Sequence, residues 1–276
     1  MDRFEVKDRY TLEDFELLVR RLRDKEDGCP WDKVQTHDSI RQNFIEETYE
    51  AVDAIDKRDN LLLKEELGDV LLQVALHAEI AKEENAFDLT EVVNTLCNKL
   101  VERHPHIFGS ITADTSEKVL SNWEDIKRVE KEQKTATDAI NDLPQSLPPL
   151  MKTQKVQKRA AYVGYEYSTI NSAFSDFVDA VEGLRCALSR NTDYFETIGD
   201  LLFFVVNLCR LVDIDASLAL EKSTERFIER FKIIEETATS HNIDMKKAGI
   251  NTLKELYNNK IKKLEELENE HKSTRS

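Results

Sequence analysis

Apolar residues recur along this chain every three or four positions, which is the spacing of amphipathic helices. The first stretch follows a capping signal at Thr11-Leu12-Glu13-Asp14, and polar or proline-containing breaks separate the later stretches. The pattern predicts further helices at about 38–56, 61–84, 88–104, 116–134, 172–190, 192–212, 216–239 and 252–270. Only 7 glycines and 5 prolines occur in 276 residues, so we expect an all-α protein with few tight turns.

Acidic residues dominate the charge of the chain. It carries 39 Lys and Arg against 54 Asp and Glu, which gives a formal net charge of −15. Proteins that bind nucleic acid phosphates need a basic surface, so we expect no nucleic acid polymer as a partner. A small phosphorylated ligand held through a metal ion is compatible with this charge.

The cysteines and the termini indicate the compartment. No two cysteines form a Cys-x-x-Cys pair, so neither a zinc site nor a disulfide framework is indicated. Residues 1–10 are charged and lack the apolar segment of a signal peptide. The longest apolar run, at 201–212, is too short to span a bilayer. We therefore expect a cytoplasmic protein with no membrane partner.

Acidic residues flank the predicted turn at 57–60. Glu47 and Glu50 precede this turn, and Glu66 and Asp69 follow it. A helix rises about 1.5 Å per residue, so Glu50 is expected to face Glu66 across an antiparallel pair, with Glu47 meeting Asp69 one turn further along. Converging carboxylates repel one another, and a hard divalent cation such as Mg²⁺ is their natural counterweight.

A magnesium ion held by carboxylates keeps positions open for water and for substrate phosphates. The chemistry that fits such a site is hydrolysis of a phosphoanhydride. Other chemistries lack their motifs, because the sequence contains neither a Gly-x-x-x-x-Gly-Lys-Ser/Thr loop nor a Gly-x-Ser-x-Gly elbow. The competing interpretation is that these acids form an ordinary solvated helix face.

The chain also repeats itself. Residues 65–72 are echoed by 196–203, and residues 99–103 by 226–230. Two copies of one helical module explain this better than one irregular domain. We expect a first module at 1–135, a proline-containing linker at 136–150 and a second module at 151–276.

The second copy departs from the acidic pattern of the first. Aligning the repeats pairs Val178 with Glu46, Asp179 with Glu47, Glu182 with Glu50, Thr197 with Glu66, and Asp200 with Asp69. A neutral hydroxyl is a weak magnesium ligand, so the second site is expected to bind metal less well. We therefore expect the first copy to perform the chemistry and the second to be weakened or structural.

A set of motifs in order gives the chain a close resemblance to a known family. They are Cys29-Pro30-Trp31-Asp32, Gln35-Thr36-His37, Glu46-Glu47-x-x-Glu50, Glu66-x-x-Asp69 and Arg103-His104-Pro105-His106-Ile107-Phe108-Gly109. The chain resembles the MazG family of nucleoside triphosphate pyrophosphohydrolases. The resemblance implies tandem all-α modules assembled by dimerisation, and magnesium-dependent cleavage to a nucleoside monophosphate and pyrophosphate.

Roles for particular residues follow from the same resemblance. It implies Glu47, Glu50, Glu66 and Asp69 as metal ligands, and Glu46 as a further ligand or as the carboxylate that orients the attacking water. Catalysis would thus depend on Glu46, Glu47 and Glu50.

A second group of residues are candidates for binding the substrate. Lys99, Arg103 and Lys127 are candidates to contact the triphosphate, each against the alternative of an ordinary surface cation. Trp31 is a candidate to stack on the base, against the alternative of a packing residue. The histidines of the motifs, His37, His104 and His106, are expected in loops or caps, because hard Mg²⁺ favours oxygen ligands.

The leading functional interpretation is an enzyme that hydrolyses nucleoside triphosphates to clean the nucleotide pool. A related alternative is a narrow pyrophosphatase of the dUTP or dCTP type. A different class is a non-catalytic helical protein that binds a nucleotide and regulates a partner.

Overall fold

A computed structural model describes residues 4–110, 115–190 and 194–273 of the chain. Within these ranges the secondary structure consists of helices without strands, which confirms the expected all-α fold. The chain divides into two compact units, Met1–Glu130 and Lys131–Ser276. That these units are copies of one module stays a prediction. None of the helices in the described ranges is long and apolar enough to cross a membrane.

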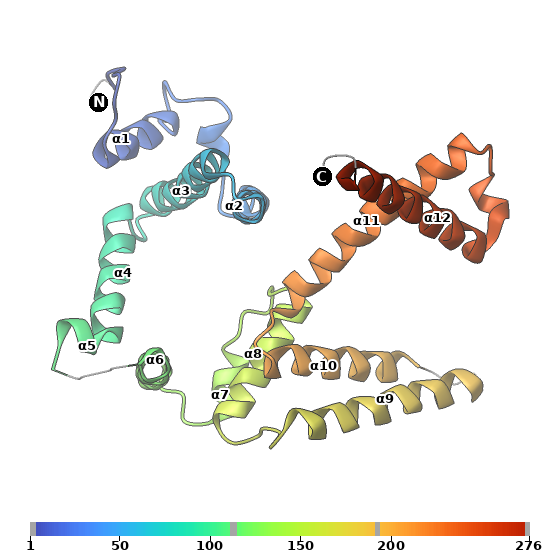
Figure 1. Cartoon of the computed structure of the whole chain (residues 1–276). Coiled ribbons are helices and arrows are strands. Elements are labelled where there is room, and N and C mark those ends of the chain that lie inside the picture. The colour runs from blue at the N-terminus through green and yellow to red at the C-terminus, as the bar shows by residue number, and fades with distance from the viewer. Residues whose placement is uncertain (1–3, 111–114, 191–193, 274–276) are drawn as a thin grey trace. The chain divides into compact units, whose positions relative to one another are not determined.

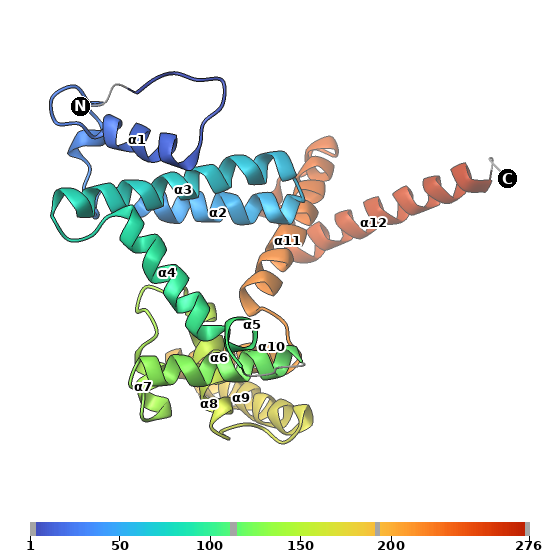
Figure 2. The same ribbon diagram turned by 90° about the vertical axis from the view of Figure 1, so that its left-hand side faces the viewer.

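The first unit is built around a helical hairpin. Helices α2 and α3 lie side by side, and α1 packs against α3 (Figures 1 and 2). The helices of this unit are α1 (Leu12–Leu22), the 3₁₀ turn η1 (Asp32–Val34), α2 (Arg41–Lys57), α3 (Asn60–Glu83), α4 (Leu89–Arg103), α5 (Pro105–Phe108) and α6 (Ser116–Glu130).

The turn between α2 and α3 is only two residues long. Arg58 ends α2 in the left-handed conformation, at φ 56° and ψ 34°. Asp59 then caps α3, because its side chain accepts hydrogen bonds from the backbone N–H groups of Leu61 and Leu62. The predicted turn at 57–60 is therefore present, and it fixes how the two helices face each other.

The buried core of the first unit lies where α1 meets the second half of α3. It consists of Val19, Ile40, Ala75, Leu76 and Ile80, each at most 3% exposed. Val19 lies on the apolar face of α1 and is buried here, whereas Leu67 and Leu71 of α3 are 54% and 40% exposed and lie outside this core. The first half of α3 carries Glu66 and Asp69 outside this core.

Arg23 is a buried cation that the sequence pattern did not single out. Its guanidinium is paired with Glu83 at 2.8 Å and donates to the carbonyl oxygens of Asp32 and Gln35. These bonds tie the loop that carries Trp31 to the end of α3. The loop therefore has a fixed position although Trp31 itself is half exposed.

The second unit contains a second helical hairpin. Helices α9 and α10 lie side by side, α8 packs against α10, and α11 packs against α12 (Figure 1). The helices of this unit are α7 (Ala136–Asn141), α8 (Pro149–Tyr162), α9 (Ile170–Arg190), α10 (Phe195–Leu211), α11 (Ala216–Ser240) and α12 (Met245–Ser273).

Short helices occur where the sequence pattern predicted breaks. Helix α7 lies inside the expected linker, where Thr135 and Asp138 form a reciprocal capping box. Pro105 was expected to end a helix, and it does so while also opening the one-turn helix α5. Helices of four to six residues are too short to show a hydrophobic period, so periodicity misses them.

Candidate active site

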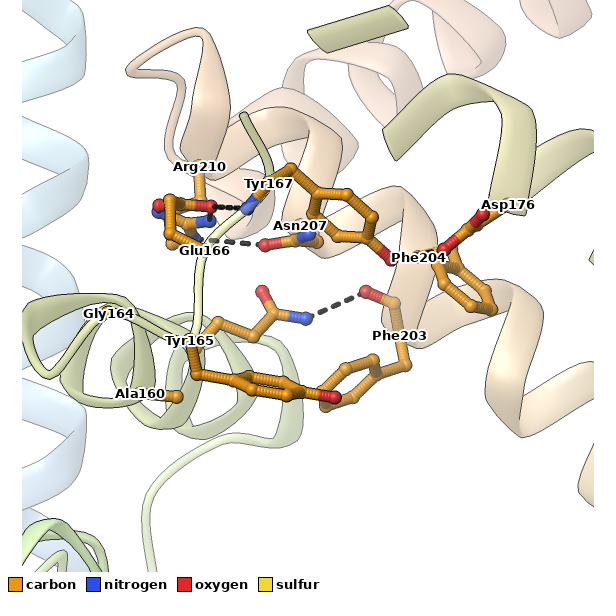
Figure 3. Close-up of a pocket in the computed structure, with 11 residues that line it drawn as sticks. Ala160, Gly164, Tyr165, Glu166, Tyr167, Asp176, Phe203, Phe204, Asn207 and Arg210 are labelled. Atoms are coloured by element: carbon orange, nitrogen blue, oxygen red, sulfur yellow. Dashed lines mark hydrogen bonds and ion pairs between the residues drawn. The ribbon is translucent and has the colours of Figure 1, made fainter. Parts of the chain in front are cut away.

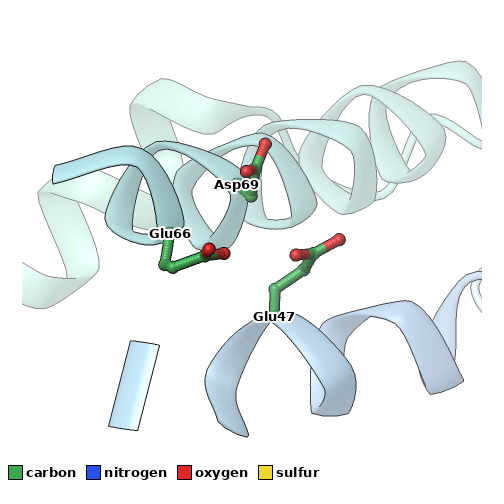
Figure 4. A group of neighbouring side chains, drawn as sticks. All are labelled: Glu47, Glu66 and Asp69. Atoms are coloured by element: carbon green, nitrogen blue, oxygen red, sulfur yellow. The ribbon is translucent and has the colours of Figure 1, made fainter. Parts of the chain in front are cut away.

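Three carboxylates converge between α2 and α3. Glu47 rises from α2 toward α3, which carries Glu66 and Asp69 one turn apart (Figure 4). Each offers one oxygen atom, and these three atoms all lie within 4.8 Å of one another. All three residues are half-buried. In the described part of the chain this is the one such group of potential metal ligands.

Glu50 belongs to the same charged cluster. The pKa of Glu47 is raised, first by burial and then by the charges of Asp69, Glu50 and Glu66. The pKa of Glu66 is also raised, first by burial and then by the charges of Glu50 and Asp69. The strongest neighbouring charge is thus Asp69 for Glu47 and Glu50 for Glu66, which is the register that helix geometry predicted.

The cluster suits a hard divalent cation. Among the described residues, the neighbouring groups that shift the pKa of Glu47 and Glu66 are all acidic. Mg²⁺ binds oxygen at about 2.0–2.1 Å, so two ligands on opposite sides of it stand roughly 4 Å apart. Oxygens within 4.8 Å of one another therefore approach the spacing that Mg²⁺ requires.

Glu46 lies outside this cluster. It is exposed, and its Oε1 accepts a hydrogen bond from Gln42 Nε2 at 3.4 Å. Consecutive residues of a helix point about 100° apart, so Glu46 flanks Glu47 and does not share its direction. This placement keeps the carboxylate of Glu46 apart from the cluster and accessible to water.

The structure gives the candidate phosphate contacts different surroundings. Arg103 forms an ion pair with Glu130, with Nε–Oε1 at 3.2 Å, and its guanidinium lies 5.4 Å from the centre of the Trp123 ring. Lys99 is exposed and Lys127 is half-buried. Their role at a triphosphate stays a prediction, as does base stacking by Trp31.

The histidines show more contacts than the sequence suggested. His37, which precedes α2, stacks on His77 of α3, with the two Nδ1 atoms 2.7 Å apart. Burial and the neighbouring His37 lower the pKa of His77. His104 caps α4 through Nδ1, which donates to the Leu100 carbonyl at 2.6 Å.

The corresponding acids of the second unit have a different arrangement. Glu182 pairs with Arg185 at 2.8 Å, and this hydrogen bond lowers the pKa of Glu182. Asp179 and Asp200 are exposed, and Thr197 is half-buried. Sequence reasoning missed Arg185, although its spacing of three from Glu182 on a helix was visible.

Similarity to known proteins agrees with the helical fold. Residues 35–108 match the model of the MazG nucleotide pyrophosphohydrolase domain. The chain is 39% identical to a nucleoside triphosphate pyrophosphohydrolase of Escherichia coli (strain K12), over 87% of this chain and 93% of that protein. It is 38% identical to the nucleoside triphosphate pyrophosphohydrolase/pyrophosphatase MazG of Thermotoga maritima, over 89% of this chain and 94% of that protein.

The matching domain and these two relatives place the chain in the class of nucleotide pyrophosphohydrolases, which are hydrolases. The chain belongs to the MazG family, as its motifs predicted. An uncharacterized protein of Bacillus subtilis, YabN, is also similar, at 36% identity over 88% of this chain and 50% of that protein.

Proposed function

We propose that this protein hydrolyses nucleoside triphosphates to nucleoside monophosphates and pyrophosphate with Mg²⁺, and so helps to clean the nucleotide pool. The observation that carries the proposal is the convergence of Glu47, Glu66 and Asp69, with Glu50 beside them. The names of the similar proteins from E. coli and T. maritima supply the substrate class.

We assign different roles to the acidic residues of this site. Glu47, Glu50, Glu66 and Asp69 would hold Mg²⁺, which polarises the phosphoryl oxygens and offsets their charge when it is bound. We assign to the exposed Glu46 the orientation of the water molecule that cleaves the anhydride between the α and β phosphates. One water is consumed, and the products are the monophosphate and pyrophosphate.

We assign this chemistry to the first module, at 1–135, and a weakened or structural role to the second, at 151–276. The support is the ligand set, because the second unit has Thr197 where the first has Glu66, and pairs Glu182 with Arg185. Asp179 and Asp200 remain as weaker remnants of a site.

We further propose that the protein is a homodimer. Large apolar side chains on the α2–α3 hairpin are 40% to 59% exposed: Ile45, Tyr49, Val52, Ile55, Leu67 and Leu71. An exposed apolar surface of this kind marks an interaction site, and burying it against a second copy would stabilise both chains. Light scattering after size-exclusion chromatography should give about twice the chain's mass of 31.9 kDa, whereas a monomer would contradict the proposal.

The activity is tested by magnesium-dependent release of pyrophosphate from a panel of ribo- and deoxynucleoside triphosphates. Wild type is compared with Glu50→Gln and with Glu182→Gln, its counterpart in the second unit. We expect Glu50→Gln to abolish release and Glu182→Gln to retain it.

The other outcomes of this experiment are equally informative. Loss in Glu182→Gln alone would move the chemistry to the second unit. Release from dUTP or dCTP alone would favour the narrow pyrophosphatase. Nucleotide binding without release, by folded protein with Mg²⁺, would favour the regulatory protein and contradict the enzyme.

A further inference from the structure

Two histidines meet at the open end of the α2–α3 hairpin, which is the end away from the two-residue turn. His37 lies in the loop just before α2, and His77 lies in the second half of α3. Their Nδ1 atoms are 2.7 Å apart, the two ring planes differ by 6°, and the ring centres are 5.0 Å apart. At this distance the Nδ1–H of one ring donates a hydrogen bond to the Nδ1 of the other. The contact therefore joins the start of α2 to α3.

The hairpin is thus fastened at both ends, and the acidic cluster lies between the two fastenings. The turn closes one end. At the open end, Phe44 of α2 adds an edge contact to the ring of His77, with 5.8 Å between the ring centres. Glu47 follows Phe44 by about one helical turn, and Asp69 precedes His77 by about two. Separation of the helices at the open end would therefore change the spacing of these carboxylates.

The histidine pair can hold one added proton but not two. A proton added to the free nitrogen of the donor ring leaves the N–H···N contact intact. For His37 that nitrogen is Nε2, which lies 3.9 Å from a carboxylate oxygen of Glu84. A second proton would occupy the accepting Nδ1, so that two cationic rings would point N–H groups at each other across 2.7 Å. The contact must then break.

Acid acts on this contact through His77. The pKa of His77 is lowered from its ordinary value of 6.5, first by burial and then by the charge of His37. The folded protein therefore disfavours protonated His77, and the unfolded chain takes up the proton more readily. The contribution of the pair to stability is complete above about pH 6.5, and it is lost as the pH falls from there to the lowered pKa.

Other charged groups around the pair do not supply this sensitivity. Among the described residues, the one charge that shifts the pKa of His77 is that of His37. The charged side chains on the neighbouring elements are either paired between α1 and α3 or exposed on the loop and on α2: Arg20 with Glu79, Arg23 with Glu83, Asp38 and Arg41.

The acidic cluster responds to acid in the opposite direction. Burial and neighbouring carboxylates raise the pKa of Glu47 and of Glu66, so acid neutralises these groups and removes their repulsion. Acid thus favours approach of the helices in the middle of the hairpin and their separation at His37 and His77. Opening of that end at low pH would therefore not come from the carboxylates.

We propose that His37 and His77 form an acid-sensitive clasp, which holds the start of α2 against α3 at neutral pH and releases it when both rings are protonated. The clasp is a property of the hairpin with or without metal, so it does not depend on the proposed function. Where that function holds, His37 and His77 are positioning residues, because they act through the spacing of Glu47 from Asp69.

The test is hydrogen exchange of the full-length protein in EDTA at pH 7.5 and pH 5.5, followed by mass spectrometry and corrected for the intrinsic pH dependence of exchange. Opening takes up about one proton, so its equilibrium constant should rise roughly tenfold per pH unit below 6.5. We expect peptides that cover residues 36–46 to lose about tenfold in protection at pH 5.5. Peptides that cover the turn at 55–62 are the internal control and should change less than about twofold.

Variants separate the clasp from other effects of acid. In His77→Gln the amide oxygen accepts a hydrogen bond from His37 whether that ring is neutral or charged, so residues 36–46 should change less than about twofold between the two pH values. His37→Ala removes the contact from a half-exposed loop position and should leave these residues weakly protected at both. His241→Gln, in the second unit, is the matched control and should behave as wild type does.

Three results would overturn the proposal. Wild type could show no loss of protection at 36–46, His77→Gln could lose as much as wild type, or the turn at 55–62 could lose protection equally, which would mark unfolding of the whole hairpin. The expected pH response, in a protein that releases no pyrophosphate from any nucleotide, would contradict the proposed function and leave the clasp standing.

Discussion

The acidic residues of the two helical hairpins have different neighbours, and their pKa values shift in opposite directions. Between α2 and α3, burial and the charges of the facing carboxylates raise the pKa of Glu47 and of Glu66. On α9, Glu182 is paired with Arg185, and its pKa is lowered. The carboxylates of the first hairpin are thus arranged to suit a cation from outside the chain, whereas Glu182 of the second hairpin pairs with Arg185 on its own helix. This difference separates a metal site from an ordinary charged helix face better than the number of acids does.

The largest expected effect is on turnover. Asp69→Asn should reduce pyrophosphate release about 10³-fold or more, because a metal ligand contributes several kcal/mol to transition-state stabilisation. The matched change Asp200→Asn in the second unit should alter the rate less than twofold. Steady-state kinetics with saturating Mg²⁺ measures both, and equal losses would remove the distinction between the hairpins.

The next effect is on thermal stability. Mg²⁺ at one hundred times its Kd should stabilise the first unit by about 2.7 kcal/mol, which is roughly 5–10 °C in Tm. Glu66→Gln should abolish this shift, while Glu182→Gln should retain it. Differential scanning calorimetry with and without Mg²⁺ provides the comparison. An unchanged shift in Glu66→Gln would show that the ion binds elsewhere.

In EDTA the same cluster should destabilise the fold. Burial and the charge of Asp69 raise the pKa of Glu47, so its ionised form is disfavoured in the folded protein. At pH 8 the neutral variant Glu47→Gln should therefore melt a few degrees above wild type without metal, and below it with metal. A lower Tm of the variant in EDTA would contradict the repulsion.

The comparison between the hairpins can also be tested by engineering a metal site into the second one. Thr197→Glu restores the missing carboxylate, and Arg185→Ser removes the competing cation. The double variant should bind Mn²⁺, used as a paramagnetic probe in place of Mg²⁺, about tenfold more tightly at the second unit than either single variant. Relaxation measurements in a Glu66→Gln background isolate this site, and additive single effects would argue against direct competition.

The smallest expected effect is a pH dependence in the second unit. Hydrogen bonding to Arg210 lowers the pKa of Glu166 from its ordinary value of 4.5. The pair thus stabilises the fold above about pH 4.5, and this contribution is lost as the pH falls through the lowered pKa. Glu166→Gln should cost about 1 kcal/mol at pH 7 and less at pH 3. Urea unfolding at both pH values measures the difference.

The register of the acidic cluster was predictable because it depends on local geometry alone. A two-residue turn and a constant helical rise determine which residues of α2 and α3 meet. Arg103 and Glu130 are 27 residues apart, and their pairing depends on how α6 packs on α4, which no spacing rule supplies. The role of Glu46 came from the family resemblance and stays a prediction, since the structure shows this residue exposed and next to Glu47 on α2.

A cavity of about 510 Å³ in the second unit depends on the same kind of long-range packing, so the sequence did not predict it (Figure 3). Residues of α8, of α10 and of the loop that follows α8 line it. Gln157 and Phe203 are 46 residues apart, and they meet only because α8 packs against α10. Gly164, which follows α8, has a positive φ of 92° that suits a glycine, but a glycine in the sequence does not indicate that the loop forms the wall of a cavity. Gln157 stands in a basic helical stretch, where the sequence alone predicts a surface residue, because glutamine is mostly exposed in proteins.

The two-residue turn at Arg58 and Asp59 has an evolutionary consequence. Replacement of Arg58 by Gly or Asn keeps the left-handed conformation, so substitutions there should be tolerated. One added residue inside α3 before Glu66 would instead rotate all that follows by about 100° and shift it by about 1.5 Å. Both acids of α3 would then leave Glu47 together. The proposed active site is thus sensitive to the length of this segment more than to its composition. Active descendants of this protein should therefore differ here by substitutions and not by insertions.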